Sequence, residues 1–311
     1  MNRRTPFTHF DADALRVSEV ISRGASKGRV QAKDMPRASH GIIVNPSLMP
    51  LHSLELRCRA LLPVLRPTDA FSRFTAAELY GLALPRKRAL GVRDPLPIDI
   101  VTELPARALR RAGVASHSVR AQTVEVHRLA GLPVTSPADT WCMLAGRVSH
   151  ERLVALGDAV LTGLRIDRGG GQRSPPLATL AELYAACAQH ERSVGSVARA
   201  AALPLLRWPV DSPAESALRL RIREAGLPDP QVNCPIEVEG RTLHADLGYP
   251  TFRVAIEYEG RYHFTGGEEQ ARFDVERHEL MIAAGWRVLR ATARDLRSPE
   301  SFLRRLSEAL R

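Results

Sequence analysis

The sequence predicts a multidomain protein of mixed structure, of the α+β or α/β class, on three observations. Its 311 residues are enough for two or three domains with separate cores. Helical and strand-like periodicities alternate along the chain. Over residues 206–311 they follow one order of helix, three strands, helix, strand and helix. This order predicts a compact mixed sheet of four strands flanked by helices.

Residues 1–50 are expected to form a small domain. Apolar side chains at near-helical spacing predict helices over 12–23 and 26–35, and "HGIIV" at 40–44 then fits a short strand. This is the element order of a winged helix-turn-helix, a domain that binds DNA. The basic residues of the second helix, which suit phosphate contacts, are Lys27, Arg29 and Lys33. A helical cap with solvated charges would give the same pattern.

Residues 51–205 are interpreted as a central α/β scaffold. Strand-like alternation at 97–102 and 123–129 is interspersed with helical patterns, and Ser136 stands where a helix N-cap is expected, before a proline. Glycine and proline mark residues 165–178 as a loop. No combination of residues in this segment has the pattern of a catalytic site.

Residues 206–311 are expected to form the C-terminal domain. Glu239 and Gly240 separate two strand-like segments and predict a hairpin turn. The predicted elements are a helix at 212–226, strands at 231–238, 241–249 and 252–259, a helix at 268–285, a strand at 286–292 and a helix at 298–310. The apolar residues expected to face the core from the long helix are Phe273, Leu280 and Ile282.

The composition favours a polyanionic partner such as DNA. Lysine and arginine number 44 against 34 aspartate and glutamate, a formal net charge of +10 at pH 7. The excess is almost wholly arginine, and a coding bias toward arginine would give the same composition without such a partner. The lysines are Lys27, Lys33 and Lys87. A mechanism that uses lysine is therefore excluded from the C-terminal half.

The sequence predicts neither a membrane segment nor export. It has no run of about 18 apolar residues, and its first residues lack the apolar core of a signal peptide. The cysteines, at positions 58, 142, 187 and 234, are far apart and form no C-x-x-C pair. We expect a cytoplasmic protein with reduced cysteines and no membrane partner.

The stretch "VAIEYEGRYH" at 254–263 combines a strand pattern with two acids. Apolar residues alternate with Glu257 and Glu259, so one strand face is apolar and both carboxylates point to the other. Neighbouring buried carboxylates repel each other and must be protonated or neutralised. Either they face water or a cation lies between them.

Two further carboxylates are expected near this pair. In the preceding strand Asp246 should lie opposite the apolar face made by Leu243, Ala245 and Leu247, and Glu215 lies in the first turn of the preceding helix. Together these acids predict a site for one or two divalent cations, Mg²⁺ or Mn²⁺. Such ions bind oxygen ligands, activate water and stabilise a leaving oxygen.

Each of these residues also has a purely structural explanation. Glu215 stands three residues after Ser212 and is expected first as its capping-box partner. Asp246 could pair with a nearby arginine, and Glu259 could be exposed to solvent. His263 is either a surface histidine or a general acid or base that acts near neutral pH.

Several segments of the C-terminal domain occur together in one known family. They are "SPAES", "ADLGYP", "VAIEYEGRYH", "DVERHELMIAAGWRVLRAT" and the closing helix. In this order, residues 212–311 resemble a small domain of unknown function related to the very-short-patch-repair endonucleases, within the PD-(D/E)xK nuclease superfamily. The resemblance implies a restriction-endonuclease-like fold in which Asp246 and Glu257 hold the metal, with Glu215 and Glu259 assisting.

The chain departs from the superfamily pattern at one position. Two residues after the second acid the superfamily has a lysine, and this chain has Glu259. Related domains often have an acid there, so the change alone does not imply inactivity. Either His263 or Arg277, which lies in the D-x-x-R motif of the long helix, takes the role of this lysine, or the role is absent. Arg277 would steady the negative charge that develops on the phosphate.

The segments "DAFSRFTAAELYGLALP", "VEVHRLAGLPVTSPADTW" and "LVALGDAVL" carry a looser likeness over the first 200 residues. They resemble the AbiEi-type antitoxins and transcriptional regulators, in which a winged helix precedes an α/β domain. This resemblance implies operator DNA or a toxin as possible partners.

Two functional hypotheses follow. The first is a metal-dependent DNA endonuclease of defence, repair or mobile-element type, which explains the converging acids. The second is a non-catalytic, antitoxin-like DNA-binding regulator with a nuclease-like scaffold domain, which explains the missing lysine. An RNA- or protein-interaction module on the same fold is a third. We expect the endonuclease.

Overall fold

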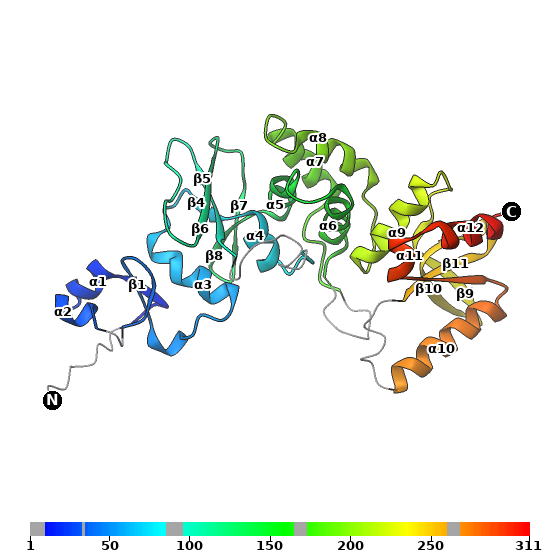
Figure 1. The fold of residues 1–311 in the computed structure, drawn as a ribbon, viewed down its shortest axis with the longest axis horizontal. Helices are drawn as coiled ribbons and strands as arrows, with labels where there is room; N and C mark the ends of the chain where they lie inside the picture. The colour runs from blue at the N-terminus through cyan, green and yellow to red at the C-terminus, as the bar shows by residue number, and fades with distance from the viewer. Residues whose placement is uncertain (1–9, 33–34, 85–95, 165–172, 260–267) are drawn as a thin grey trace. The chain divides into compact units, whose positions relative to one another are not determined.

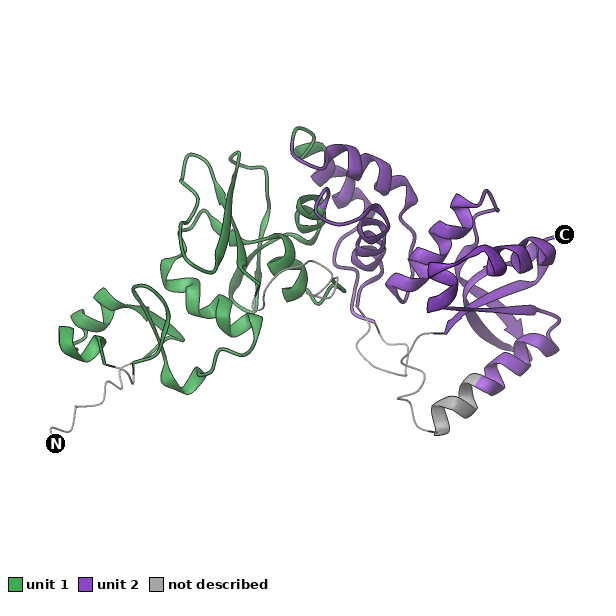
Figure 2. Ribbon diagram, viewed as in Figure 1, with its two compact units in different colours: residues 1–144, 188–192 green, residues 145–187, 193–311 purple. Residues whose placement is uncertain are grey.

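The computed structural model describes residues 10–32, 35–84, 96–164, 173–259 and 268–311 (Figure 1). The chain divides into two compact units, residues 1–144 with 188–192 and residues 145–187 with 193–311 (Figure 2). The described residues have mixed α/β structure, with sheets of three, five and four strands. The predicted mixed class and the four-stranded C-terminal sheet are confirmed. No helix in the described ranges combines the length and apolar composition needed to cross a membrane.

The N-terminal elements of unit 1 build the three-stranded sheet. They are β1 (Ala14–Arg16), α1 (Val17–Ser22), α2 (Lys27–Val30), β2 (Arg37–Ser39) and β3 (Ile42–Val44), and the antiparallel strand order is β1-β3-β2. The prediction of a helix from residue 12 is wrong for residues 14–16. Leu15 is buried there and pairs with Ile43, and this non-local pairing overrides the local helical spacing.

The second sheet of unit 1 has the strand order β6-β5-β4-β8-β7. Its elements are α3 (Leu54–Leu61), η2 (Leu62–Val64), β4 (Asp69–Phe71), α4 (Arg73–Leu79), β5 (Ile98–Glu103), β6 (Val114–Val119), β7 (Val126–Leu129), β8 (Leu132–Thr135) and α5 (Pro137–Leu144). Ser136 precedes α5, as predicted, and its hydroxyl donates to Asp139 at 2.7 Å. His190 contacts the other oxygen of this buried carboxylate at 2.9 Å, which anchors residues 188–192 to unit 1.

Unit 2 begins with helices that lead into the C-terminal sheet. They are α6 (His150–Thr162), α7 (Leu180–Gln189), whose last residues belong to unit 1, α8 (Ser196–Ala202), η4 (Leu203–Leu205) and α9 (Pro213–Glu224). A buried ion pair joins α6 to α9, because Arg219 Nη2 lies 3.1 Å from Asp158 Oδ2 and both side chains are at most 1% exposed. The Ser216 hydroxyl and the Arg207 backbone N–H also donate to this carboxylate, each at 2.7 Å.

The four-stranded sheet of unit 2 has the order β12-β11-β10-β9, antiparallel except for the parallel pair β11–β12. Its elements are β9 (Gln231–Val238), β10 (Arg241–Tyr249), η5 (Pro250–Phe252), β11 (Val254–Glu259), α10 (Glu268–Ala283), β12 (Arg287–Thr292), α11 (Ala293–Arg297) and α12 (Glu300–Ala309). The predicted hairpin turn is confirmed: Glu239 and Gly240 both have positive φ, 50° and 74°, as a two-residue primed turn requires.

Two cores lie on opposite faces of this sheet (Figure 1). The α10 core contains Cys234, Ile236, Ala245, Ala255 and Met281. The α12 core contains Leu218, Ile222, Leu247, Tyr249, Ile256, Leu289, Phe302 and Leu306. The prediction that Ile282 faces inward is wrong, because its exposed fraction is 52% whereas that of Met281 is 1%. Leu280 does pack against the α10 core, and the side chain of Phe273 lies outside the described residues.

Replacing Asp158 with alanine should lower the free energy of unfolding by about 3–5 kcal/mol, because Arg219 would stay buried without its counter-charge. The double variant Asp158→Ala, Arg219→Met should recover much of that loss, because it leaves no buried charge. Urea unfolding followed by circular dichroism measures both. Equal destabilisation of the single and double variants would contradict this origin of the loss.

Candidate functional site

The pairing of β9 and β10 is interrupted at the residues of the candidate site. Asn233 has a φ of 46°, and the register of the two strands omits the pair Asn233–Asp246. On either side of this irregularity β10 contributes to different cores: Ala245 packs in the α10 core and Leu247 in the α12 core. The prediction that Leu243, Ala245 and Leu247 share one face is therefore wrong. The alternation of side chains between the two sheet faces is therefore interrupted at Asp246.

Asp246 and Glu257 lie side by side on neighbouring strands. Leu247 pairs with Ile256 in the β10–β11 register, and one further step places Asp246 opposite Glu257. Burial, together with the negative charge of Asp246, raises the pKa of Glu257 to about 7. Asp246 Oδ2 accepts a hydrogen bond from the backbone N–H of Tyr258 at 2.7 Å. The structure thus brings together the two acids predicted as principal metal ligands.

Arg277 places a positive charge beside this pair. It extends from α10, forms a salt bridge through Nη2 with Glu257 Oε2, and donates through Nη1 to the carbonyl oxygen of His244 at 2.9 Å. The exposed fractions of the two ion-pair side chains are 26% for Arg277 and 14% for Glu257. A half-buried guanidinium is therefore fixed between the helix and the acidic strand ends, where it offsets part of the carboxylate repulsion.

Glu257 has one carboxylate oxygen that receives no hydrogen bond from the described residues. Its Oε1 is buried and accepts no hydrogen bond from any described residue. A buried acceptor left in this state is energetically unfavourable and calls for a water molecule or a cation. This atom is the strongest local indication of a ligand at the site.

Glu259 lies at the more exposed end of the same strand. Its Oε1 lies 2.9 Å from Arg290 Nη1, and the exposed fractions of the two side chains are 44% and 51%. The charge of Glu259 also reaches His278 on α10, the residue after Arg277. Burial and the nearby positive charges of Arg290 and Arg277 lower the pKa of His278, which keeps its imidazole largely neutral at pH 7.

Glu215 has the structural role expected first for it. Its Oε1 accepts from the Ser212 hydroxyl at 2.7 Å and its Oε2 from the Asp211 backbone N–H at 2.9 Å, while Ser212 Oγ accepts from the Glu215 N–H. These reciprocal bonds fix the N-terminus of α9. The further role predicted for Glu215, as a third metal ligand, stays a prediction.

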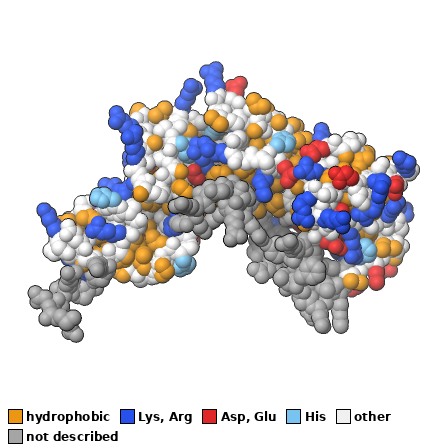
Figure 3. Space-filling model, viewed as in Figure 1, with side chains coloured by type: hydrophobic (Ala, Val, Ile, Leu, Met, Phe, Trp, Pro, Cys, Tyr) orange, Lys and Arg blue, Asp and Glu red, His pale blue; other side chains and the backbone are white. Residues whose placement is uncertain are grey.

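Two predicted residues, His263 and Lys33, lie outside the described residues. Lys27 is exposed on α2, and the half-buried Arg29 follows it in the same short helix. On the face shown in Figure 3, acidic side chains gather among basic ones over the C-terminal elements, and basic side chains predominate over the N-terminal ones. This distribution is compatible with the predicted phosphate contacts.

The residues present fit a divalent cation of the magnesium type. Mg²⁺ retains several waters and commonly binds through one or two carboxylates together with substrate phosphates. Asp246 and Glu257 supply two carboxylates, and the unpaired Oε1 supplies an acceptor for positive charge. Within the described residues, no three His, Cys, Asp or Glu side chains form a group that could hold an ion.

Sequence reasoning missed three residues of this site: Asn233, His278 and Arg290. Asn233 lies inside the strand predicted over residues 231–238, so the strand pattern gave no signal of a break. His278 directly follows Arg277 in α10, but consecutive side chains of a helix point about 100° apart, so this adjacency gave no signal of its position. Arg290 is opposite Glu257 in the β11–β12 register, which only strand pairing could reveal.

The chain is similar to two curated proteins of Mycobacterium tuberculosis, Uncharacterized protein MT2308 (strain CDC 1551 / Oshkosh) and Uncharacterized protein Rv2248 (strain ATCC 25618 / H37Rv). Each is 28% identical to it over 224 residues, which cover 72% of this chain and 74% of the relative. No protein-family model matches the chain. No solved structure matches it either.

The free energy of unfolding should depend on pH through Glu257. Its folded pKa, about 7, lies above the ordinary value of 4.5, so its protonation stabilises the folded domain. This contribution is fully present below about pH 4.5 and is lost as the pH rises through about 7. Each unit of pKa difference corresponds to about 1.4 kcal/mol.

Urea unfolding in EDTA between pH 4.5 and 8 measures this dependence. The variant Glu257→Gln should lose the part of the pH dependence that lies between pH 4.5 and 7. The control Glu259→Gln, altered at the exposed end of the same strand, should retain the wild-type curve. Parallel curves for wild type and Glu257→Gln would show that the carboxyl of Glu257 is not the titrating group.

Proposed function

We propose that the chain is a metal-dependent DNA endonuclease whose C-terminal domain hydrolyses phosphodiester bonds. The supporting observation is the side-by-side pair Asp246 and Glu257, in which one buried oxygen has no partner among the described residues. A pure scaffold gains nothing from such a pair, because neighbouring carboxylates repel each other in a partly buried setting. The proposal includes a restriction-endonuclease-like fold for the four-stranded sheet.

Asp246 and Glu257 would hold Mg²⁺ or Mn²⁺ as one or two ions. When bound, such an ion supplies positive charge to the scissile phosphate and lowers the pKa of water. The residues of the chain then have separate tasks. Tyr258 N–H orients Asp246, and Arg277, held beside Glu257, would donate to the charged phosphate oxygens.

A proton acceptor for the attacking water is available near the acids. His278 has a lowered pKa and lies within electrostatic reach of Glu259 and Arg277, so its neutral imidazole can accept a proton near pH 7. Glu259 and His263 remain further candidates for this role. Glu259 is held beside Arg290 at the surface.

The N-terminal sheet supports DNA as the substrate class. The order β1-α1-α2-β2-β3 and the antiparallel sheet are compatible with a winged helix-turn-helix. In that arrangement α2 would face the DNA, with Lys27 and Arg29 contacting phosphates. This domain would deliver the catalytic domain to its substrate.

A second candidate function is a non-catalytic DNA-binding regulator of the antitoxin type. The favouring observation is the ion pair between Arg277 and Glu257, which already neutralises one of the two acids from within the protein. The replacement of the superfamily's lysine by Glu259, paired with Arg290, agrees with this alternative. Operator DNA or a toxin would then be the partner.

The variants Asp246→Asn and Glu257→Gln should each reduce cleavage at least about 100-fold, because each removes a charged ligand of the ion. DNA affinity should stay close to wild type, and circular dichroism should show that both variants are folded. The assay uses supercoiled, linear, mismatched and single-stranded DNA with Mg²⁺, Mn²⁺ or EDTA. Glu237→Gln serves as a matched control, since Glu237 is an exposed acid of β9 bonded to Thr242.

Metal-dependent nicking that both site variants lose and the control retains would support the endonuclease. DNA binding without cleavage under every metal condition would favour the regulator. A loss of DNA affinity in Asp246→Asn would indicate that this acid maintains the binding surface instead of a metal.

A further inference from the structure

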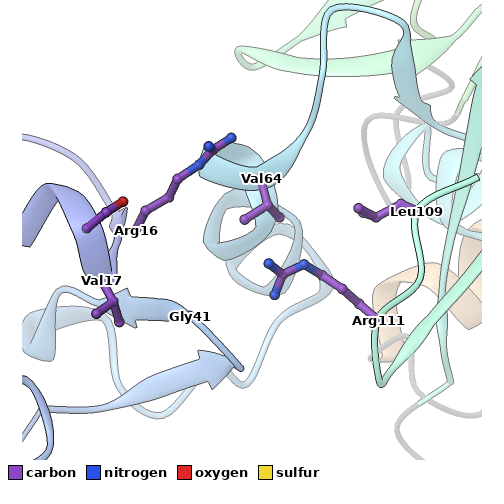
Figure 4. Close-up of a pocket in the computed structure, with 7 residues that line it drawn as sticks. Arg16, Val17, Gly41, Val64, Leu109 and Arg111 are labelled. Carbon is purple, nitrogen blue, oxygen red and sulfur yellow. The ribbon is translucent and has the colours of Figure 1, made fainter. Parts of the chain in front are cut away.

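Unit 1 contains a pocket with a volume of about 360 Å³. The residues that line it are distant in sequence from the acidic site. Its lining comes from the end of β1 and the start of α1, the β2–β3 turn, η2 and the loop before β6. The residues that line it are Arg16, Val17, Ser18, Gly41, Val64, Leu109 and Arg111. Figure 4 shows the side chains of Arg16 and Arg111 extending toward Val64 from different elements. None of the described residues that line the pocket is an acid.

Both arginines are anchored by uncharged acceptors. Arg16 Nε donates to the carbonyl oxygen of Pro63 at 2.6 Å. Arg111 Nη1 donates to the carbonyl oxygen of His40 at 2.6 Å and to Ser39 Oγ at 3.0 Å. These bonds fix the direction of each guanidinium, yet they leave its charge unneutralised and several N–H groups available.

Other arginines nearby in unit 1 are neutralised by acids. Arg23 pairs with Asp11 at 2.5 Å, and Arg59 pairs with Glu55 at 2.9 Å and with Asp13 at 3.4 Å. In contrast, no described carboxylate forms an ion pair with Arg16 or Arg111. The nearby Glu19 accepts the backbone N–H of Arg16 and completes the cap of α1. The pocket therefore contains two positive charges that no acid of the described residues neutralises.

We propose that this pocket binds a backbone phosphate of DNA, held by the guanidinium groups of Arg16 and Arg111. The planar fork of arginine matches phosphate oxygens, and two fixed forks lose little side-chain freedom on binding. Ser18 adds a hydroxyl donor at the rim. The exposed Arg107 and Arg110 in the same loop also have no ion pair with a described residue, which extends the positive surface from the pocket.

This proposal rests on DNA as the partner in the proposed function, and it adds a contact outside α2. Such a contact would position the DNA without reading its sequence, because phosphate contacts carry no base information. The same phosphate contact would serve an endonuclease and a DNA-binding regulator equally.

The test measures the affinity of the full-length protein for a fluorescent duplex at several salt concentrations, in EDTA to prevent cleavage. Arg16→Ala and Arg111→Ala should each weaken binding about tenfold and reduce the slope of log affinity against log salt by about 1. Arg16→Lys and Arg111→Lys, which keep the charge and lose the fork, should give intermediate affinities. The control Arg23→Ala removes a neutralised arginine and should change affinity less than twofold.

Thermal unfolding of every variant, with and without inorganic phosphate, completes the experiment. Wild-type affinity and salt slope in both alanine variants would overturn the proposed phosphate site in the pocket. Cleavage at the acidic site does not depend on this result, so failure of the phosphate site and failure of the proposed endonuclease are distinguishable. The protein could instead bind no duplex and be stabilised by inorganic phosphate in a way that depends on Arg16 and Arg111. This result would identify free phosphate as the ligand and overturn the proposal of a DNA phosphate. If the lysine variants unfold normally and bind as tightly as wild type, positive charge alone accounts for the contact and the two-fork geometry is overturned.

Discussion

The repulsion between Asp246 and Glu257 is the constraint around which the C-terminal site is organised. Two carboxylates on adjacent strands, in a partly buried position, raise each other's free energy unless positive charge or protons compensate. The backbone N–H of Tyr258 and the guanidinium of Arg277 supply part of this compensation. The pKa of Glu257 still rises to about 7, so the protein's own groups leave the compensation incomplete.

The position of these acids depends on an irregularity of the sheet. At Asn233 the β9 backbone enters the left-handed region, and β10 changes the core that its side chains enter. Without this break, strict alternation would have placed Ala245 and Leu247 in one core and Asp246 on the opposite face. β-bulges and similar breaks commonly re-aim side chains beside functional sites. Here the break coincides with Asp246, at the position where the register of β9 and β10 omits one pair.

The abundant arginines divide into classes that composition cannot separate. Arg219 is fully buried and paired with Asp158, so it joins α6 to α9. Arg277 is half-buried and paired with a site acid. Arg16 and Arg111 are tied to uncharged oxygens and keep their charge for a ligand. A net charge of +10 therefore says little about binding until the partner of each guanidinium is known.

Local chemistry in the sequence determined the C-terminal order of elements, the Glu239–Gly240 turn, the start of α5 and the alternation that sets Glu257 apart from its apolar neighbours. These features depend on residues a few positions apart, so spacing alone reveals them. Tertiary structure decided that residues 14–16 are a strand, that Met281 is buried in place of Ile282, and that Arg277 neutralises Glu257. Those outcomes depend on partners distant in sequence, whose free energies of pairing and burial outweigh local propensity.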